Sequence, residues 1–233
     1  MEKIWITSDW HFNHNKSFLY EPRGFSNIED MNNAIIDKHN SLVSLNDEVY
    51  VLGDLCLGGS ENNKNNKILL EQLNGNIHVI IGNHCTPNRV EMYKTCNNIK
   101  EIIGYAGMLI YKKYHFYLSH YPTLTSNLDL DKPLKARIIN LCGHSHTQNR
   151  WNDWDKGLIY HCEMEAHNCY PVLLDDIINQ VKNKIEPESK PEPQQLNTQA
   201  RCYKCIYSWP LCGNNFENCK SYKRDPPDGG YYG

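Results

Sequence analysis

Short apolar segments that lead into acidic or imidazole side chains constrain this chain more than any other feature. Residues 3–7 and 49–52 are β-prone runs that end just before Asp9 and Asp54. Between these runs, residues 28–41 carry apolar side chains at helical spacing. Strands that alternate with helices indicate an α/β fold with largely parallel central strands. The carboxyl ends of such strands meet at one edge of the sheet, so we expect polar side chains to gather there.

The second half of the chain is richer in β-prone residues. Two runs within residues 108–119 meet at a Lys-Lys pair, which predicts a hairpin. Further strands are expected at residues 137–142 and 158–162, and a last helix near Asp175 or Asp176. These elements predict a second sheet that packs on the first. The expected fold is an α/β sandwich of two β-sheets flanked by helices.

Side chains that can bind metals stand at several predicted strand ends. They are Asp9, His11, Asp54, Asn83, His84, His120, His144 and His146. Carboxylate, amide and imidazole donors in one set favour Mn, Fe, Ni or Zn over Mg and Ca. Two neighbouring cations need a bridging carboxylate, and Asp54 is the expected bridge. Because water between two cations becomes a nucleophile near neutral pH, the set predicts phosphoester hydrolysis.

Five short motifs carry a resemblance to a known family. In chain order they are Asp9-Trp10-His11, Gly53-Asp54, Gly82-Asn83-His84, Ser119-His120 and Gly143-His144-Ser145-His146. The set resembles the motifs of the calcineurin-like metallophosphoesterases over roughly residues 1–176. Residues 7–14 and 168–176 are most similar to the small prokaryotic and phage-type members. The resemblance implies a metallophosphoesterase domain over residues 1–185.

The resemblance also implies a role for each motif residue. One cation is assigned to Asp9, His11, Asp54 and His146, and the other to Asp54, Asn83, His120 and His144. His84 is assigned the role of general acid, which protonates the leaving oxygen. His14 and Arg23 lie in the loop after the first strand, where the family places groups that contact substrate. Cys85 stands where an acidic residue often follows the Gly-Asn-His triplet, so the sequence does not predict what orients His84.

The predicted reaction is hydrolysis of a phosphate ester by a hydroxide that bridges two divalent cations. A phosphodiester of a nucleotide or nucleic acid is favoured, because no cap domain is evident and the C-terminal region is basic. One alternative is a phosphomonoesterase that acts on nucleotides or proteins. Another is a noncatalytic binding module on the same scaffold. The presence of every expected ligand type argues against that second alternative.

The remaining histidines are assigned no chemistry. His39, His78 and His115 lie in periodic helix or strand segments and are expected to be structural. His161 and His167 follow the last motif, near Glu163 and Glu165; a place at the edge of the site is the alternative, and a surface position is favoured. No role is assigned to the asparagines of the polar loops, namely Asn13, Asn15, Asn62, Asn63, Asn65 and Asn66.

A cysteine-rich segment follows the predicted phosphoesterase domain. Residues 186–200 are rich in Pro, Glu and Gln and indicate a linker. The pattern C-x2-C-x6-C-x6-C then predicts one structural Zn in a module of residues 201–224, bound by Cys202, Cys205, Cys212 and Cys219. Two disulfides are the alternative. A flexible tail is expected at residues 225–233.

The predicted zinc module is locally basic and contains interleaved aromatic residues. Such a mixture suits docking of nucleic acid, by base stacking and phosphate neutralisation. It equally suits protein docking or a miniature core with a solvated face. The structural interpretation is favoured, because small zinc modules commonly pack their aromatic side chains.

Composition limits the partners and the compartment. The formal net charge of -3 argues against a nucleic-acid surface over the whole body. No apolar run reaches the roughly 18 residues of a membrane span, and no secretory leader is evident. The six cysteines outside the module lack short-loop pairing. We therefore expect a cytoplasmic protein, of a cell or of an infected host cell, without membrane contact.

Overall fold

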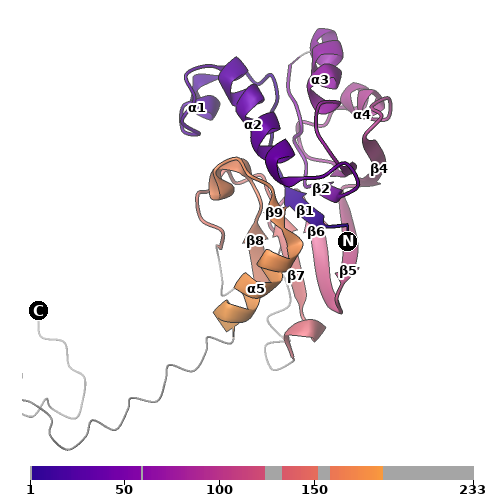
Figure 1. The fold of residues 1–233 in the computed structure, drawn as a ribbon, viewed down its shortest axis with the longest axis vertical. Coiled ribbons are helices and arrows are strands. Elements are labelled where there is room, and N and C mark those ends of the chain that lie inside the picture. Colours follow the sequence, from indigo (N-terminus) through magenta and orange to yellow (C-terminus); the bar gives the residue numbers. More distant parts are fainter. Residues whose placement is uncertain (1, 59, 124–132, 152–157, 186–233) are drawn as a thin grey trace, which may run out of the picture. The chain divides into compact units, whose positions relative to one another are not determined.

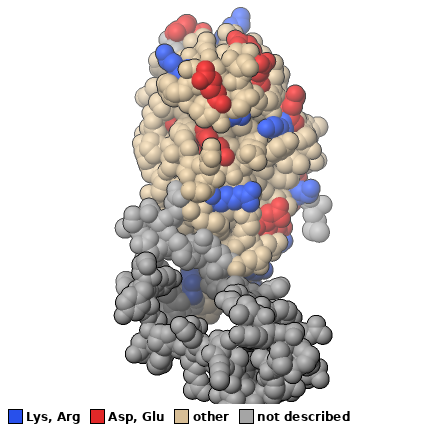
Figure 2. All heavy atoms as spheres, turned by 90° about the vertical axis from the view of Figure 1, so that its left-hand side faces the viewer, with Lys and Arg blue, Asp and Glu red and all other residues tan. Residues whose placement is uncertain are grey.

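Two β-sheets face each other in the computed structural model of this chain (Figure 1). The structure describes residues 2–58, 60–123, 133–151 and 158–185. The predicted linker, zinc module and flexible tail lie outside the described residues. None of the helices in the described part has the length and apolar character that crossing a bilayer requires. On the face that Figure 2 shows, acidic and basic side chains are interspersed over the described part.

The first sheet has the strand order β4-β3-β2-β1-β9. Its strands are β1 (Ile4–Thr7), β2 (Glu48–Val51), β3 (Asn76–Ile80), β4 (Ile99–Gly104) and β9 (Val172–Leu173). The first four are parallel, and β9 pairs antiparallel with β1. The carboxyl ends of the parallel strands therefore meet at one edge.

Helices cover one face of the first sheet. They are α1 (Ser17–Tyr20), α2 (Ile28–Leu42), α3 (Asn63–Leu70, preceded by the 3-10 turn η1, Ser60–Asn62) and α4 (Pro87–Tyr93). The Asn27 side chain caps α2 by accepting from the Asp30 N–H at 2.8 Å. Met31 of α2 and Tyr93 of α4 pack on Val49 and Val79 of the sheet.

The second sheet has the order β5-β6-β7-β8. Its strands are β5 (Ala106–Tyr111), β6 (Tyr114–Ser119), β7 (Ile138–Cys142, preceded by the turn η3, Leu134–Ala136) and β8 (Leu158–His161). The hairpin of β5 and β6 turns at Lys112 and Lys113, both with positive φ, as expected for a tight two-residue turn. Strands β6, β7 and β8 are parallel.

A second core fills the space between the sheets. Ile6, Leu52 and Ile80 point from the first sheet towards Phe116 and Leu141 of the second. Their neighbours along the strands point to the helices instead, because side chains alternate between the faces of a sheet. The last helix, α5 (Leu174–Ile185), contributes Ile177, Ile178 and Val181 to this core.

The fold class predicted from the sequence is confirmed, and most of its elements were foreseen. The short elements α1, α4 and β9 and the strand β4 were not. The prediction that His161 and His167 lie at the surface is wrong, since they are 2% and 7% exposed. His161 ends a strand of the buried sheet and contacts Glu163 at 3.0 Å, while His167, in the turn η5 (Met164–His167), contacts the His161 carbonyl at 2.8 Å.

Candidate metal centre

Five ligand-type residues leave their strands with an uncommon backbone conformation. Positive φ angles between 48° and 73° are shared by Asp9, His11, Asp54, His144 and His146. This region is unfavourable for residues other than glycine, so neighbouring contacts must hold it. The Asp9 N–H donates to the Gly53 carbonyl at 3.1 Å, and the His11 N–H donates to the Asp54 carbonyl at 3.0 Å. These hydrogen bonds join the loops after β1 and β2.

The glycines of the motifs allow the loops to approach one another closely. A β-carbon at Gly82 would overlap the Asp54 carboxylate, and one at Gly143 would overlap the Asp9 carboxylate. The Gly-Asn-His and Gly-His-Ser-His sequences therefore need glycine so that their backbone can lie against the carboxylates of other motifs. The resulting cluster draws on both sheets.

Asp9, His11 and His146 form the first group of converging side chains. Asp9 Oδ1 lies 3.6 Å from His11 Nε2 and 3.8 Å from His146 Nε2. Asp9 Oδ1 and both ring nitrogens of His11 are buried without a hydrogen-bond partner among the described residues. Buried polar atoms are normally paired, so an unpaired carboxylate oxygen facing an imidazole nitrogen fits a cation between them. Burial favours the neutral carboxyl, but the neighbouring histidines outweigh it and hold the pKa of Asp9 well below its usual value.

Asn83, His120 and His144 form the second group. Asn83 Oδ1 lies 2.7 Å from His120 Nε2 and 3.0 Å from His144 Nδ1, and the two nitrogens are 3.2 Å apart. His120 Nδ1 lies 2.8 Å from the Leu52 carbonyl, to which it can only donate. Burial lowers the pKa of His120, but Asp54 and Asp9 outweigh it, so the net shift is upward. When His120 is neutral, the lone pair of Nε2 faces the Asn83 oxygen. Such lone pairs repel unless a proton or a cation lies between them, so this group also fits a metal ion.

Asp54 lies between the two groups and is 1% exposed. Its Oδ2 is 3.4 Å from His120 Nε2 and 3.8 Å from His11 Nε2. Potential ligand atoms of Asp9, Asp54 and His120 lie within 4.8 Å of one another. Burial raises the pKa of Asp54, but the hydrogen bond and charge of His120 outweigh it, so the net shift is downward. Asp54 is therefore available as an anion that faces both groups.

Glu165 supports the first group, a role that the sequence did not assign to it. Its Oε1 accepts from His146 Nδ1 at 2.8 Å, which leaves His146 Nε2 facing Asp9. A carboxylate that holds the far nitrogen of a histidine fixes the orientation and tautomer of a metal ligand. Burial raises the pKa of Glu165, but His146 and Arg23 outweigh it and lower that pKa overall. No spacing in the sequence links Glu165 to His146.

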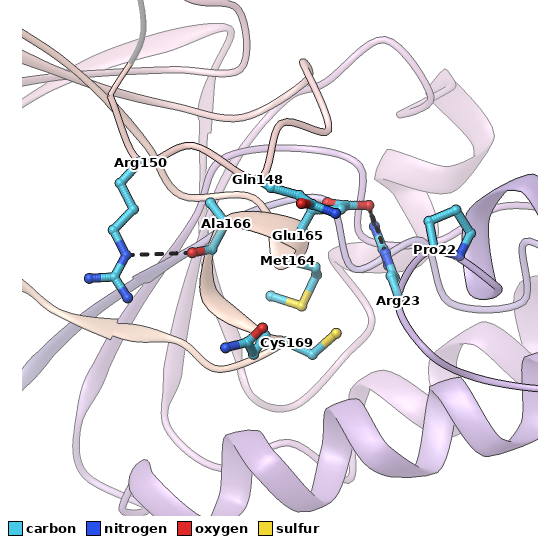
Figure 3. A pocket seen from close by; sticks show the side chains of 9 residues that line it. Pro22, Arg23, Gln148, Arg150, Met164, Glu165, Ala166 and Cys169 are labelled. Carbon is cyan, nitrogen blue, oxygen red and sulfur yellow. Dashed lines mark hydrogen bonds and ion pairs between the residues drawn. The ribbon is translucent and has the colours of Figure 1, made fainter.

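Arg23 directs its guanidinium at protein groups. It pairs with Glu165 at 2.8 Å and donates to the carbonyls of Asp9 at 2.9 Å and Trp10 at 3.1 Å. These contacts favour a positioning role for Arg23 over the predicted contact with substrate. The ion pair lies on the wall of a pocket of about 410 Å³ (Figure 3). This pocket is also lined by Pro22, Gln148, Arg150, Met164, Ala166, Asn168 and Cys169.

His84 and His14 lie beside the two groups. His84 Nε2 is 4.0 Å from Asp54 Oδ2, and the His84 side chain is 42% exposed. The His84 backbone is fixed on both sides, because its N–H donates to Asp54 Oδ1 at 2.9 Å and its carbonyl accepts from Arg89. The His14 ring lies 5.3 Å from that of His11 and 6.2 Å from that of His84. Burial, with the charges of His11 and His84, lowers the pKa of His14 to about 4.

The paired sheets and their shared cluster of carboxylate, amide and imidazole groups define a phosphoesterase scaffold with candidate metal ligands. The chain belongs to the calcineurin-like phosphoesterase family, whose profile matches residues 2–194. Membership indicates a hydrolase that acts on phosphate esters and uses divalent metal ions. The part of the resemblance that concerns the family is thereby confirmed.

Two proteins whose own functions are not assigned are similar to this chain. An uncharacterised protein of Methanocaldococcus jannaschii is 35% identical over 190 residues, which span 79% of this chain and 95% of the relative. A crystal structure of a protein of unknown function from Aquifex aeolicus is similar in fold, with a TM-score of 0.55 and 18% identity over 77% of this chain and 100% of that one. The latter likeness supports the fold alone.

Proposed function

We propose that this protein hydrolyses a phosphodiester of a nucleotide or nucleic acid at a centre that holds two divalent cations. The observation that supports this proposal most strongly is the convergence of two groups of unpaired or mutually repelling donor atoms on Asp54. Asp9, His11 and His146 would hold one cation, and Asn83, His120 and His144 the other, with Asp54 shared. Bound there, the cations would activate a water molecule and neutralise the phosphate oxygens. Mn, Fe, Ni and Zn suit this donor set.

In this proposal His84 is the general acid. Its ring stands beside Asp54 and remains open to solvent, where a phosphate could reach it. An imidazole there can give a proton to the leaving oxygen. The contacts from Asp54 and Arg89 hold the backbone of His84. The acidic residue that often follows the Gly-Asn-His triplet is replaced here by Cys85. His14 remains a proposed substrate contact.

The preference for a diester rests on the open site. The His144 and His84 side chains are reachable from solvent, and no separate cap covers them within the described residues. Phosphomonoester hydrolysis is the second proposal. A noncatalytic role is disfavoured, because all seven proposed ligands and His84 lie together.

Further parts of the proposal concern the rest of the chain. We retain the small prokaryotic or phage-type branch, the structural Zn on the four C-terminal cysteines, and a cytoplasmic location. The six described cysteines are buried and free, which is compatible with a reducing compartment. Docking of nucleic acid or protein by the zinc module also remains a proposal.

Metal analysis combined with an Asp54→Asn variant tests the function. The purified chain should bind two divalent cations besides the structural Zn and should hydrolyse diesters. Asp54→Asn removes the shared negative charge while it preserves the shape of the side chain. We expect loss of at least one cation and a fall in turnover by orders of magnitude. Near-normal activity of Asp54→Asn would refute the dinuclear assignment.

A further inference from the structure

Two exposed aromatic side chains border the metal centre. Phe18 of α1 is 70% exposed, and Tyr121, just past the end of β6, is 50% exposed. Single exposed aromatic residues are ordinary at protein surfaces, so exposure alone carries little weight. The position of these two is informative, because each ring contacts a histidine of the site.

The two rings approach the centre from different groups. The Phe18 ring lies 5.7 Å from that of His14, whose other ring neighbours are His11 and His84. The Tyr121 ring lies 4.5 Å from that of His144 and 5.1 Å from that of His120. Phe18 therefore adjoins the side with the first group and His84, and Tyr121 adjoins the second group.

We propose that Phe18 and Tyr121 are stacking platforms for the bases of the two nucleosides joined by the scissile phosphate. This inference rests on the proposed function. A phosphodiester has two ester arms, and a phosphate bound by the proposed cations on either side of Asp54 would extend one arm towards each ring. Aromatic side chains stack on every base, so such platforms favour a nucleic-acid linkage with little sequence preference. A simple alkyl diester would use neither ring.

The expected effect is measurable for each ring. Loss of one stacked ring should reduce kcat/KM between about 5-fold and about 150-fold on a substrate that has a base on that arm. Because the rings adjoin different groups, the losses in a double variant should multiply. The defect should lie mainly in KM, since stacking binds substrate and transition state alike.

The test compares dithymidine monophosphate with dimethyl phosphate, which has no ring on either arm, on the metal-loaded full chain. The readout is the ratio of their kcat/KM values in Phe18→Ala, Phe18→Leu, Phe18→Tyr, Tyr121→Ala and Tyr121→Phe. Both alanine variants should lower this ratio at least about 5-fold. Phe18→Tyr and Tyr121→Phe keep an aromatic ring and should preserve the ratio, whereas Phe18→Leu should lower it. Leu45→Ala is the control for loss of an exposed apolar side chain, because Leu45 is 74% exposed and precedes the amino end of β2, at the edge of the sheet opposite the carboxyl ends.

An unchanged ratio in both alanine variants would overturn the proposal that Phe18 and Tyr121 stack on the bases. So would full rescue by Phe18→Leu, since that result would mean apolar contact without stacking. Turnover of the methyl ester by the wild type separates this inference from the proposed function. If the wild type hydrolyses neither ester, the proposed function fails. If it hydrolyses both with no preference for the dinucleotide, only the platforms fail.

Discussion

Replacing Glu165 by glutamine tests whether a carboxylate that touches no substrate sets the metal affinity of the centre. Glu165→Gln keeps the length of the side chain and an oxygen acceptor. It removes the negative charge that faces His146 Nδ1 and Arg23, each 2.8 Å away. His146 then loses the partner that fixes its tautomer, and the amide can turn its NH₂ group towards the ring.

The magnitude follows from the contact that is lost. Removal of a carboxylate behind a metal-binding histidine typically costs about 10- to 100-fold in metal affinity or activity. This range corresponds to about 1.4–2.7 kcal/mol. The apo-protein should also lose stability, because the Arg23 guanidinium keeps its charge in a buried place. That loss should stay below the roughly 3–5 kcal/mol typical of a fully broken buried pair, since glutamine still accepts a hydrogen bond.

The assay is a titration of the apo-protein with Mn or Zn, read by calorimetry and by the activity that each metal addition restores. Glu165→Gln should require about 10- to 100-fold more of the more weakly bound metal, and saturating metal should recover most of the turnover. Glu101→Gln is the matched control, because Glu101 contacts His78 at 3.1 Å in a carboxylate–histidine pair of β3 and β4. Equal metal affinity of wild type and Glu165→Gln would refute the positioning role.

Three further outcomes are expected. His84→Ala should leave both cations bound and lose about 10²–10⁴-fold on nucleoside esters but little on a nitrophenyl ester, whose leaving group needs no proton; an equal loss on both would contradict the general-acid role. Cys202→Ser with Cys205→Ser should release about one Zn while turnover of a small diester persists; collapse of that turnover would mean that the tail completes the site. Burial lowers the pKa of His39 to about 4 from an ordinary 6.5 despite its hydrogen bond to the Asn74 carbonyl. Because the unfolded chain then binds the extra proton, His39 destabilises the fold as pH falls from about 6.5 to about 4, by at most about 3 kcal/mol. The midpoint of thermal unfolding of His39→Gln should vary less over this range, and an unchanged pH dependence would contradict this linkage.

The sequence predicted the elements and residues whose signals are local. The strands that lead to Asp9 and Asp54 are apolar runs, and the helix at residues 28–41 has a clear period. Strand β4 was missed because its burial pattern is mostly exposed or intermediate, so it shows no buried apolar run. The two-residue strand β9 exists only through its pairing with β1. Such elements depend on tertiary contacts that no local pattern contains.

The supporting residues of the site were harder to predict than its ligands. Asn13 illustrates this, because it received no role from the sequence. Its side chain donates to Asn66 Oδ1 at 2.6 Å and accepts from Asn32 at 3.0 Å, which ties the loop after β1 to α2 and α3. The partners lie 19 and 53 residues away in the chain, so only the folded structure brings them together. The polar loops contain many asparagines, so nothing in the sequence distinguished Asn13 from the others.

The contacts of Arg23 link the two sheets behind the centre through protein groups. Asp9 comes from the first sheet and His146 follows the second, so their separation depends on how the two sheets are held. Arg23 binds the Asp9 and Trp10 carbonyls and, through Glu165, reaches the far nitrogen of His146. These are charge-assisted hydrogen bonds in a buried setting, where they are stronger than at the surface. They hold Asp9 Oδ1 and His146 Nε2 facing each other, 3.8 Å apart. Because these ligands are already ordered, metal binding costs little free energy for ordering them. Loss of the Arg23–Glu165 contacts should therefore weaken the metal affinity of the site more than the turnover of the metal-saturated enzyme.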